Sequence, residues 1–393
     1  MDRHDYYGGA EAALSLQEAE TWAVASREST VFSERQVAHS ISNNENSETG
    51  PRLSFPRAYS LALAPQIIYT RSSLLPALVS SRSDAQLEFL AVGSWWIHSA
   101  AAQPSSSATL LRVPSGREDI FADQSFDARA KRALMKFLRF VGDYEEQEEL
   151  WHEYKDRPLV QFLASRFPLP LQVQHTILAL TLMPVAPDHI ITSIALSRIA
   201  RHLRSLGLFG PGFAALIPKW GGLSEIAQVG CRAGAVGGGV YVLNNGVADA
   251  QEVEGGISTL TLKNGEVVKT HYYVASEDNV NPDVTSSTAT ADILCRSISV
   301  VSSLLSKLFP GLVEGSPPPA AAVVVFPGSP AIENNNRANT SQVIITIHSA
   351  DTGECPTGQC KSATPFSQIR MMINFITYII CNNLDVTQLS TFV

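Results

Sequence analysis

The sequence predicts a mixed α/β fold, in which a sheet domain is interrupted by an inserted all-helical domain. Apolar runs of strand length lie on both sides of the middle of the chain, at residues 91–98, 296–301, 320–326 and 343–348. The middle, from residue 125 to residue 206, carries apolar residues at helical spacing instead. An Asn-Gly pair at residues 264–265, between two alternating segments, adds a β-hairpin.

Length and composition limit the class of protein. A chain of 393 residues can form two or three domains. The formal net charge of -8 argues against nucleic acid as a partner, because phosphate binding needs clustered Lys and Arg. An odd number of cysteines, five, favours reduced thiols over a disulfide framework. No segment reaches the roughly 18 apolar residues of a membrane span, and residues 1–5 do not resemble a secretory signal, so we expect a cytoplasmic protein.

Helical periodicity justifies the inserted domain, for which we predict residues 121–207. Its first helix has one apolar stripe, made of Ala130, Leu134, Phe137, Leu138 and Val141. Further helices are predicted at residues 159–167, 171–182 and 188–206. In the last helix we expect an inward face of Ile191, Ile194, Ala195, Ile199 and Leu203, and an outward face of Arg198, Arg201, His202 and Arg204.

The sheet domain surrounds this insertion, with residues 1–120 before it and residues 208–360 after it, and residues 361–393 form a separate tail. Residues 11–27 have helical composition. Residues 28–51 and 103–109 are polar and cannot bury enough apolar surface to order themselves, so we predict flexible insertions there.

One stretch, residues 216–245, has the pattern of a loop, a helix, a glycine break and a strand. Gly221 and Gly222 suit a turn, Ser224 suits the N-cap, and residues 225–236 suit a helix. That helix would carry Glu225, Gln228 and Arg232 on one face. Residues 240–243 read as a buried strand. Taken alone, the polar face is typical of a solvated helix.

The same stretch resembles the signature block of the Rab GDP-dissociation inhibitor and Rab escort protein family, P-x-Y-G-x-G-E-L-P-Q-x-F-x-R-x-x-A-x-x-G-G-x-Y. The matching residues are Pro218, Trp220, Gly221, Glu225, Gln228, Arg232, Ala235, Gly238, Gly239 and Tyr241. One extra residue precedes Glu225, Ala227 replaces the usual proline, and Val240 replaces the threonine common in the inhibitors. Three other segments resemble family blocks: the YYGG turn at residues 6–9, the R-x-x-x-x-x-E-F run at residues 82–89, and SADTGECP at residues 349–356.

This resemblance implies a flavoprotein-like fold and a platform that binds the GDP form of Rab GTPases through Tyr7, Arg82, Glu225, Gln228 and Arg232, with Val240 at the position of a Rab-contacting threonine. Tyr7 could equally be a turn tyrosine that covers a sheet edge. The resemblance further implies that the helical domain receives geranylgeranyl chains and docks the Rab geranylgeranyl transferase heterodimer. It implies transient membrane contact, and a non-catalytic protein with no catalytic residue, cofactor or metal.

Within the family, the departures from the motif favour an escort protein of fungal type. A Rab GDP-dissociation inhibitor, which recycles prenylated Rabs, is the alternative. A second alternative is an FAD-dependent oxidoreductase of the same fold, but the chain has no G-x-G-x-x-G, the glycine turn that a pyrophosphate needs. P-loop, G-x-S-x-G and H-E-x-x-H motifs are absent too, and Cys355, Cys360 and His348 are too few for a structural zinc site.

The two ends depart from the family pattern. The YYGG turn normally follows a strand, a glycine-rich turn and a helix, so we expect the chain to be truncated before Asp2. Loss of a central strand would leave its neighbours without backbone partners, so an unstable product is expected. Past Cys360 we find no family counterpart, and a tail foreign to the family is expected there.

Overall fold

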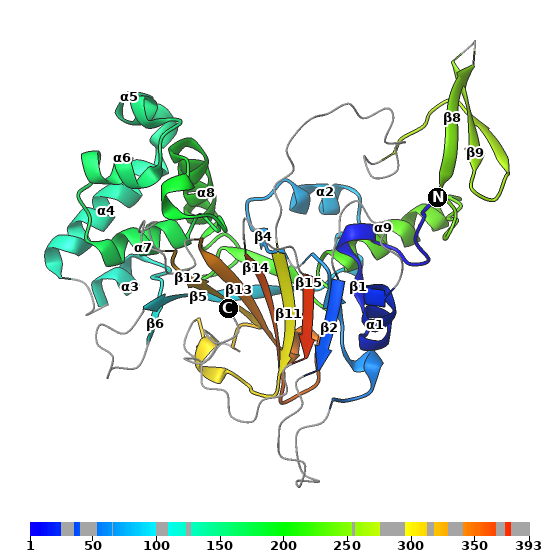
Figure 1. Ribbon diagram of the computed structural model, residues 1–393. Coiled ribbons are helices and arrows are strands. Elements are labelled where there is room, and N and C mark those ends of the chain that lie inside the picture. The colour runs from blue at the N-terminus through cyan, green and yellow to red at the C-terminus, as the bar shows by residue number, and fades with distance from the viewer. Residues whose placement is uncertain are drawn as a thin grey trace, which may run out of the picture.

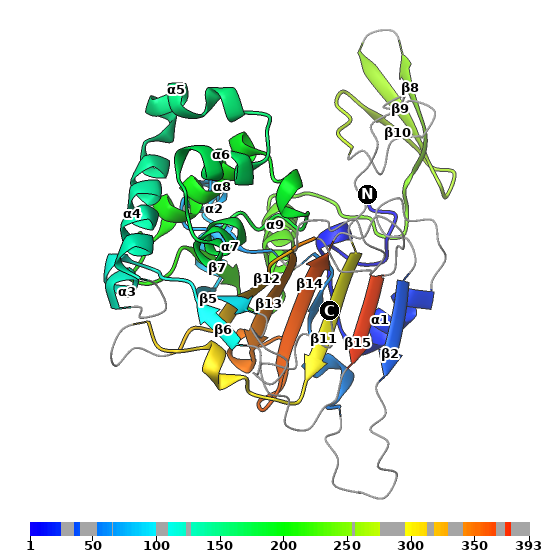
Figure 2. The same cartoon turned by 60° about the vertical axis from the view of Figure 1, so that its left-hand side comes forward.

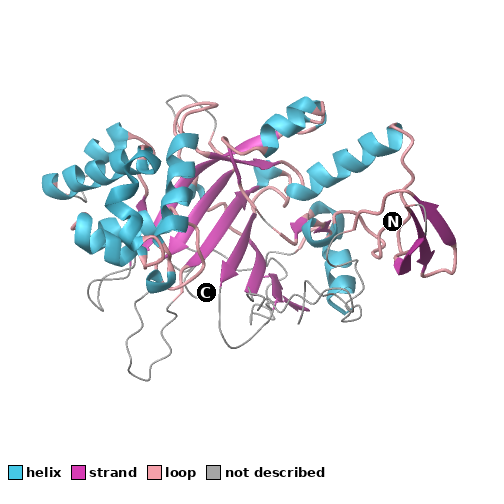
Figure 3. Cartoon of the chain, turned by 90° about the horizontal axis from the view of Figure 1, so that it is seen from above, coloured by secondary structure: helices cyan, strands magenta, loops and turns pink. Residues whose placement is uncertain are grey.

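A large mixed sheet forms the centre of the protein, and most helices gather at one end of it (Figures 1 and 3). The computed structural model describes residues 1–24, 35–39, 53–64, 66–99, 109–122, 127–253, 256–275, 295–312, 318–328, 341–366 and 374–378. The predicted combination of a mixed sheet with helices between its strands is confirmed.

The large sheet has ten strands in the order β2-β15-β11-β14-β13-β12-β5-β7-β4, with β6 paired to β5. Their bounds are β2 Arg35–His39, β4 Ile68–Tyr69, β5 Phe89–Ser99, β6 Thr109–Arg112, β7 Ala215–Pro218, β11 Cys295–Val301, β12 Ala321–Phe326, β13 Val343–Ser349, β14 Cys360–Phe366 and β15 Asn374–Tyr378. The pairs β5–β12, β11–β15 and β2–β15 are parallel, and the other pairs are antiparallel.

Strand β12 lies inside this sheet and is buried on both faces. Val323 and Val325 pack toward the helices, while Ala322 and Val324 pack on the opposite face against a second apolar cluster that includes Leu308. This alternation follows from the two-residue period of a strand, and it explains why residues 320–326 read as a continuous apolar run.

Two smaller sheets complete the strands. Strands β1 (Ala13–Leu14) and β3 (Leu61–Ala62) form an antiparallel pair. Strands β8 (Val247–Val253), β9 (Ile257–Leu262) and β10 (Val267–Thr270) form an antiparallel meander that projects beyond the main sheet (Figure 2). The predicted Asn-Gly hairpin is confirmed, because Gly265 takes a positive φ of 86° between β9 and β10 and its N–H donates to the Leu262 carbonyl.

Between β6 and β7 the described residues form six α-helices, which gather at one end of the large sheet and share an apolar cluster with β5, β7 and β12 (Figures 1 and 2). They are α3 Arg117–Ala122, α4 Ala128–Gly142, α5 Glu148–Trp151, α6 Leu159–Arg166, α7 Leu171–Ala179 and α8 Thr192–Ser205. Asp127 caps α4, since its carboxylate accepts the Ala130 N–H at 2.6 Å. Four residues of the predicted α4 stripe are buried, but Phe140 rather than Leu138 is the fifth.

Helix α8 turns toward the sheet differently from the prediction. Ala195 and Ile199 are buried as expected, whereas Ile194 is exposed. His202, predicted on the outward face, is buried with its ring 4.6 Å from that of Trp95 on β5 and 6.0 Å from that of Tyr69 on β4. It lies three residues after Ile199, on the same side of the helix. Burial lowers the pKa of His202 to about 4, so the imidazole is neutral in this contact.

The remaining α-helices of the described segments are α1 Leu16–Val24, α2 Leu74–Ser80 and α9 Leu223–Val236. Helix α1 starts later than the predicted residue 11, because a capping box sets its first turn. The Ser15 N–H donates to the Glu18 carboxylate at 2.8 Å, and the Glu18 N–H donates back to the Ser15 hydroxyl at 3.4 Å.

The predicted insertion at residues 28–51 was wrong for one segment. Strand β2 (Arg35–His39) lies within it and pairs with β15 through backbone groups. Its Val37 also packs against the apolar cluster that includes Leu14 and Trp22, so both contacts order the segment. The rest of that insertion and most of the one at residues 103–109 fall outside the described residues. Residues 361–366 and 374–378, in the segment without an expected family counterpart, supply most of β14 and all of β15.

Candidate functional site

The candidate site is built around helix α9, which follows β7 after a tight turn. Gly222 is the N-cap, with a positive φ of 60° that favours glycine. The predicted N-cap, Ser224, lies inside the first turn instead, where it is buried and its hydroxyl has no hydrogen-bond partner among the described residues. The predicted cap was wrong by two residues, because α9 starts at Leu223 and Gly222 takes the N-cap position without a side-chain hydrogen bond.

Glu225, Gln228 and Arg232 lie on one face of α9, as the helical period requires. Gln228 and Arg232 are exposed, whereas Glu225 is half-buried over Gly221, where an added Cβ would lie 3.1 Å from a Glu225 carboxylate oxygen. Burial raises the pKa of Glu225, and the Arg232 guanidinium opposes that rise. The face therefore offers an acceptor, an amide and a cation in line along the helix.

Three polar contacts join the segment at residues 82–89 to α9 and to Lys219 before it. The Arg232 guanidinium donates to the Gln86 side-chain oxygen at 3.2 Å. Before the helix, the Lys219 ammonium lies 2.9 Å from the Glu88 carboxylate, and the Lys219 N–H donates to the Glu88 carbonyl. Arg82 belongs to the same segment. It follows α2 with a positive φ of 56° and an exposed side chain.

Tyr7 lies against the second half of α9 and its following loop. Its ring meets that of Tyr241 edge-on at 6.1 Å. Partial burial and the neighbouring Cys231 thiol of α9 raise the pKa of Tyr7. Tyr241 in turn reaches Gly234, where an added Cβ would lie 2.2 Å from the tyrosine hydroxyl, so only glycine leaves it room. Of the six predicted residues, Glu225, Gln228 and Arg232 thus lie on α9, and Tyr7 lies beside it at Cys231 and Tyr241.

Val240 does not lie in a buried strand, so the prediction for residues 240–243 was wrong. It is 83% exposed in the loop after α9. This loop makes isolated backbone hydrogen bonds with residues 2–4, from Asp2 to Val242 and from Asn244 to His4, each at 2.8 Å. Among the described residues no element covers its outer side, which is why the apolar run stays at the surface.

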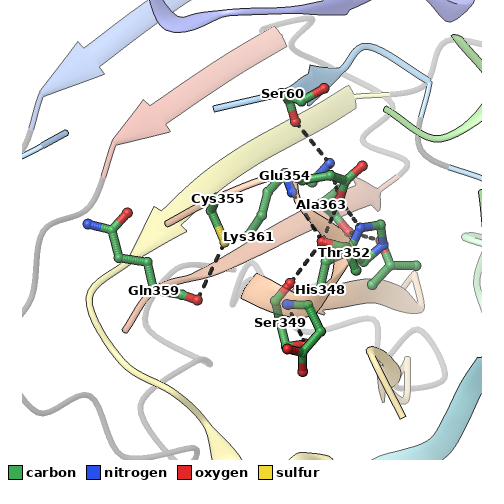
Figure 4. A network of polar contacts seen from close by, with 11 residues as sticks. Ser60, His348, Ser349, Thr352, Glu354, Cys355, Gln359, Lys361 and Ala363 are labelled. Carbon is green, nitrogen blue, oxygen red and sulfur yellow. Dashed lines mark hydrogen bonds and ion pairs between the residues drawn. The ribbon is translucent and has the colours of Figure 1, made fainter. Parts of the chain in front are cut away.

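Sequence reasoning missed a buried group of charges beside the site (Figure 4). The Glu354 carboxylate lies 2.8 Å from the Lys361 ammonium and also contacts the His348 imidazole, and all three side chains are buried. Burial opposes ionisation of Glu354, but Lys361 and His348 outweigh it and hold the carboxyl pKa at about 2. Only the SADTGECP segment pointed toward this place, since a lysine in an alternating strand normally indicates solvent.

Other chemistry is sparse in the described part of the chain. Cys355 and Cys360 are buried free thiols, and burial raises the pKa of each to about 12. No three His, Cys, Asp or Glu side chains of the described segments gather as metal ligands would. Likewise, none of the helices described is both long and apolar enough to cross a bilayer.

Comparison with known proteins gives consistent relatives. In Saccharomyces cerevisiae, the Rab proteins geranylgeranyltransferase component A is 31% identical over 245 residues, which cover 62% of this chain and 38% of that protein. The Candida albicans protein of the same name is 26% identical over 367 residues, covering 91% of this chain and 53% of that one. The chain therefore spans about half, or less, of the length of these curated relatives.

A solved structure shows the same fold. The Rab GDI of Plasmodium falciparum superposes with a TM-score of 0.61 at 17% identity, over 93% of this chain and 76% of that one. The family described as GDP dissociation inhibitor matches residues 1–306, which include α9, the segment at residues 82–89 and all six helices of the insertion. By that match over most of its length, the chain belongs to the GDP dissociation inhibitor family.

Proposed function

We propose that this chain is a Rab escort protein, the non-catalytic accessory component of Rab geranylgeranyl transferase. It binds a GDP-loaded Rab GTPase, presents it to the transferase heterodimer and accompanies the prenylated product to membranes. The observation that carries this proposal is the joining of three separate segments at α9: Tyr7 at one end, the segment of Arg82 through Gln86, and the face of Glu225, Gln228 and Arg232.

The chemistry of this surface supports recognition of a folded protein. Arg232 and Gln228 offer donors, Glu225 offers an acceptor, and all three are held on a helix rather than on a loop. The names of the fungal relatives supply the partners, Rab proteins and a geranylgeranyl transferase. The platform residues are therefore Tyr7, Arg82, Glu225, Gln228 and Arg232, with Val240 at the outer margin.

The helical group between β6 and β7 is the proposed place for the prenyl chain and the transferase. Each buried CH₂ of such a chain is worth about 0.8 kcal/mol, so an unshielded chain would insert into a membrane or aggregate. An escort therefore needs an apolar surface that can be opened, and this group of helices holds the largest apolar cluster of the described residues. A cytoplasmic protein with transient membrane contact follows from this role.

The test is a titration of the purified chain with unprenylated Rab, loaded with GDP in one series and with a non-hydrolysable GTP analogue in the other. An escort protein binds the GDP form more tightly and forms a ternary complex with the transferase heterodimer, seen by size-exclusion chromatography. The likeness to a Rab GDI favours one alternative, a dissociation inhibitor. Binding to prenylated Rab alone, without a ternary complex, would establish that alternative.

A further inference from the structure

Trp220, directly before α9, is an exposed aromatic residue held in a strained conformation. Its side chain is 53% exposed, whereas Trp22, Trp95 and Trp151 are buried and Trp96 is partly buried. Its φ is 78°, in the left-handed region that a bulky residue rarely occupies. Strain of this kind persists only where the surroundings impose it, and it gathers at functional sites.

The surroundings that impose it come from the turn between β13 and β14. The Trp220 N–H donates to the Thr352 carbonyl at 2.8 Å. Its ring lies over Gly353, where an added Cβ would come within 2.2 Å of the indole. Lys219 approaches from another side, with its ammonium 4.7 Å from the ring centroid, and is itself fixed by Glu88. The indole is therefore supported from behind and from one side, while its remaining surface faces solvent.

The turn that carries Gly353 continues into a buried polar network, which Figure 4 shows around Thr352 and Glu354. Glu354 follows Gly353 and belongs to the buried charge group with Lys361 and His348. The backbone carbonyl of Glu354 also accepts the Ser60 N–H at 3.0 Å, and the Thr352 hydroxyl donates to the Ser349 carbonyl at 2.8 Å. The Lys361 and His348 contacts both reach one Glu354 oxygen, Oε2, while Oε1 has no partner among the described residues. Together with the two backbone-directed hydrogen bonds, these buried contacts fix the turn, which is therefore a firm seat for an exposed ring.

Trp220 also adjoins the candidate site without belonging to its predicted residues. Lys219 ties it to Glu88, and Arg232 ties α9 to Gln86, so the ring borders the surface that these contacts create. A large aromatic side chain that is already fixed loses little freedom on binding, which is the property of residues that dominate protein interfaces.

We infer that Trp220 is a contact residue for the GTPase partner, presented to it by the seat at Gly353. This inference rests on the proposed function and extends its platform by an apolar anchor. The neighbouring charges of Lys219, Glu88 and Arg232 then form the polar rim that such an anchor requires.

The first experiment measures affinity for GDP-loaded, unprenylated Rab. Trp220→Ala weakens binding at least tenfold, and Trp220→Phe, which keeps a ring, weakens it less. Gly353→Ala keeps the indole but pushes it off its seat, and also weakens binding. The matched control is Phe55→Ala, a ring that is 68% exposed and lies outside both the platform and the helical group, which leaves affinity unchanged. Melting curves of the four variants identify any that fail to fold.

The second experiment follows the ring itself by its fluorescence. Of the five tryptophans, Trp22, Trp95 and Trp151 are buried, Trp96 is partly buried and Trp220 is exposed, so acrylamide quenches Trp220 most readily. The difference in quenching between the wild-type chain and Trp220→Phe isolates its emission. That difference shrinks when Rab is added if the ring is buried in the complex. Because this measurement needs only the wild-type chain and Trp220→Phe, it decides the matter even if Gly353→Ala does not fold.

The outcomes separate this inference from the proposed function. Unchanged Rab affinity of Trp220→Ala, while Arg232→Ala binds more weakly, overturns the contact and leaves the proposed function standing. If Trp220→Ala loses affinity only for prenylated Rab, the ring contacts the lipid rather than the GTPase, and the inference is also overturned. A wild-type chain that binds no form of Rab refutes the proposed function, and the inference with it.

Discussion

The helical side and the α9 side of the large sheet are held together in different ways. On the helical side, Phe137, Phe140, Phe162 and Phe167 pack with ring centroids 5.2–6.3 Å apart, in a cluster that continues into β5 and β12. On the α9 side, a buried charge group, backbone hydrogen bonds between distant turns and left-handed residues set the geometry. Non-directional packing supplies stability, whereas directional contacts fix the position of single side chains, which is what a recognition surface needs.

The largest losses of stability are expected when a buried residue at the centre of either side is replaced. On the helical side, Phe137→Ala removes a fully buried ring and should destabilise the protein by about 3–5 kcal/mol, because the packed cluster cannot close the cavity. Urea unfolding measures this loss. The remaining folded protein should keep its Rab affinity, and a loss of affinity at unchanged fold would show that the two sides are coupled. Phe121→Ala, an exposed ring, is the control and should cost less than about 0.5 kcal/mol.

On the α9 side, Glu354→Ala should also lower the free energy of unfolding by about 3–5 kcal/mol, but for another reason. It leaves the Lys361 ammonium buried without its carboxylate. Removal of that charge as well, in Glu354→Ala/Lys361→Met, should recover most of the loss. The stability lost in Phe137→Ala cannot be restored in this way, because that variant leaves no unpaired charge that a second substitution could remove. Additive losses in the double variant, read from the same unfolding curves, would mean that the pair contributes packing rather than charge.

The free energy of unfolding should depend on pH in a different range for each side. In the unfolded chain His202 binds a proton below about pH 6.5, while in the fold it stays neutral down to about 4, so stability falls as pH drops through that range. Glu354 is protonated in the unfolded chain below about pH 4.5 but stays ionised in the fold down to about 2, so its contribution is lost there. Each step is worth roughly 3 kcal/mol. Unfolding free energies measured from pH 7 to pH 3 should therefore fall in two stages, and His202→Leu should lack the first.

The smallest effect on stability, with a clear effect on binding, is expected at Arg232. Its guanidinium is exposed and makes one hydrogen bond within the chain, so Arg232→Ala should change unfolding by less than about 0.5 kcal/mol. Binding of GDP-loaded Rab should weaken by about 2 kcal/mol, because a charged donor at the centre of the platform is lost. Calorimetric titration measures this, with Arg132→Ala on α4, another exposed helical arginine, as the control. Equal affinities of the two variants would remove Arg232 from the platform.

Sequence reasoning reached the elements whose signal is local. Periodicity found α4, α6, α7 and α8, the Asn-Gly pair found the hairpin of β9 and β10, and the apolar runs found β5, β11, β12 and β13. The face of Glu225, Gln228 and Arg232 followed from the helical period alone. These features depend on residues a few positions apart, which a linear pattern records faithfully.

What could not be read from the sequence depends on contacts between distant residues. Strand β2 is ordered by its pairing with β15, far along the chain. His202 is buried because α8 packs over Trp95 and Tyr69. Lys361 looks like a solvated strand residue until Glu354 is seen beneath it. At the site, the contact of Arg232 with Gln86 and the seat of Trp220 on Gly353 depend on the folded backbone. Position of the side chains, rather than their identity, was the missing information.

The parallel pairing of β5 with β12 has a consequence for the order of folding. Residues 89–99 leave the ribosome long before residues 321–326, and the whole helical group and α9 are made between them. The helices can condense onto one face of β5 early, because their contacts are local. One edge of that strand must stay unpaired until β12 arrives, and an open edge invites pairing with other chains. While the ribosome synthesises the residues between β5 and β12, this unpaired edge is open to other chains. A pause in translation over that interval should therefore favour aggregation.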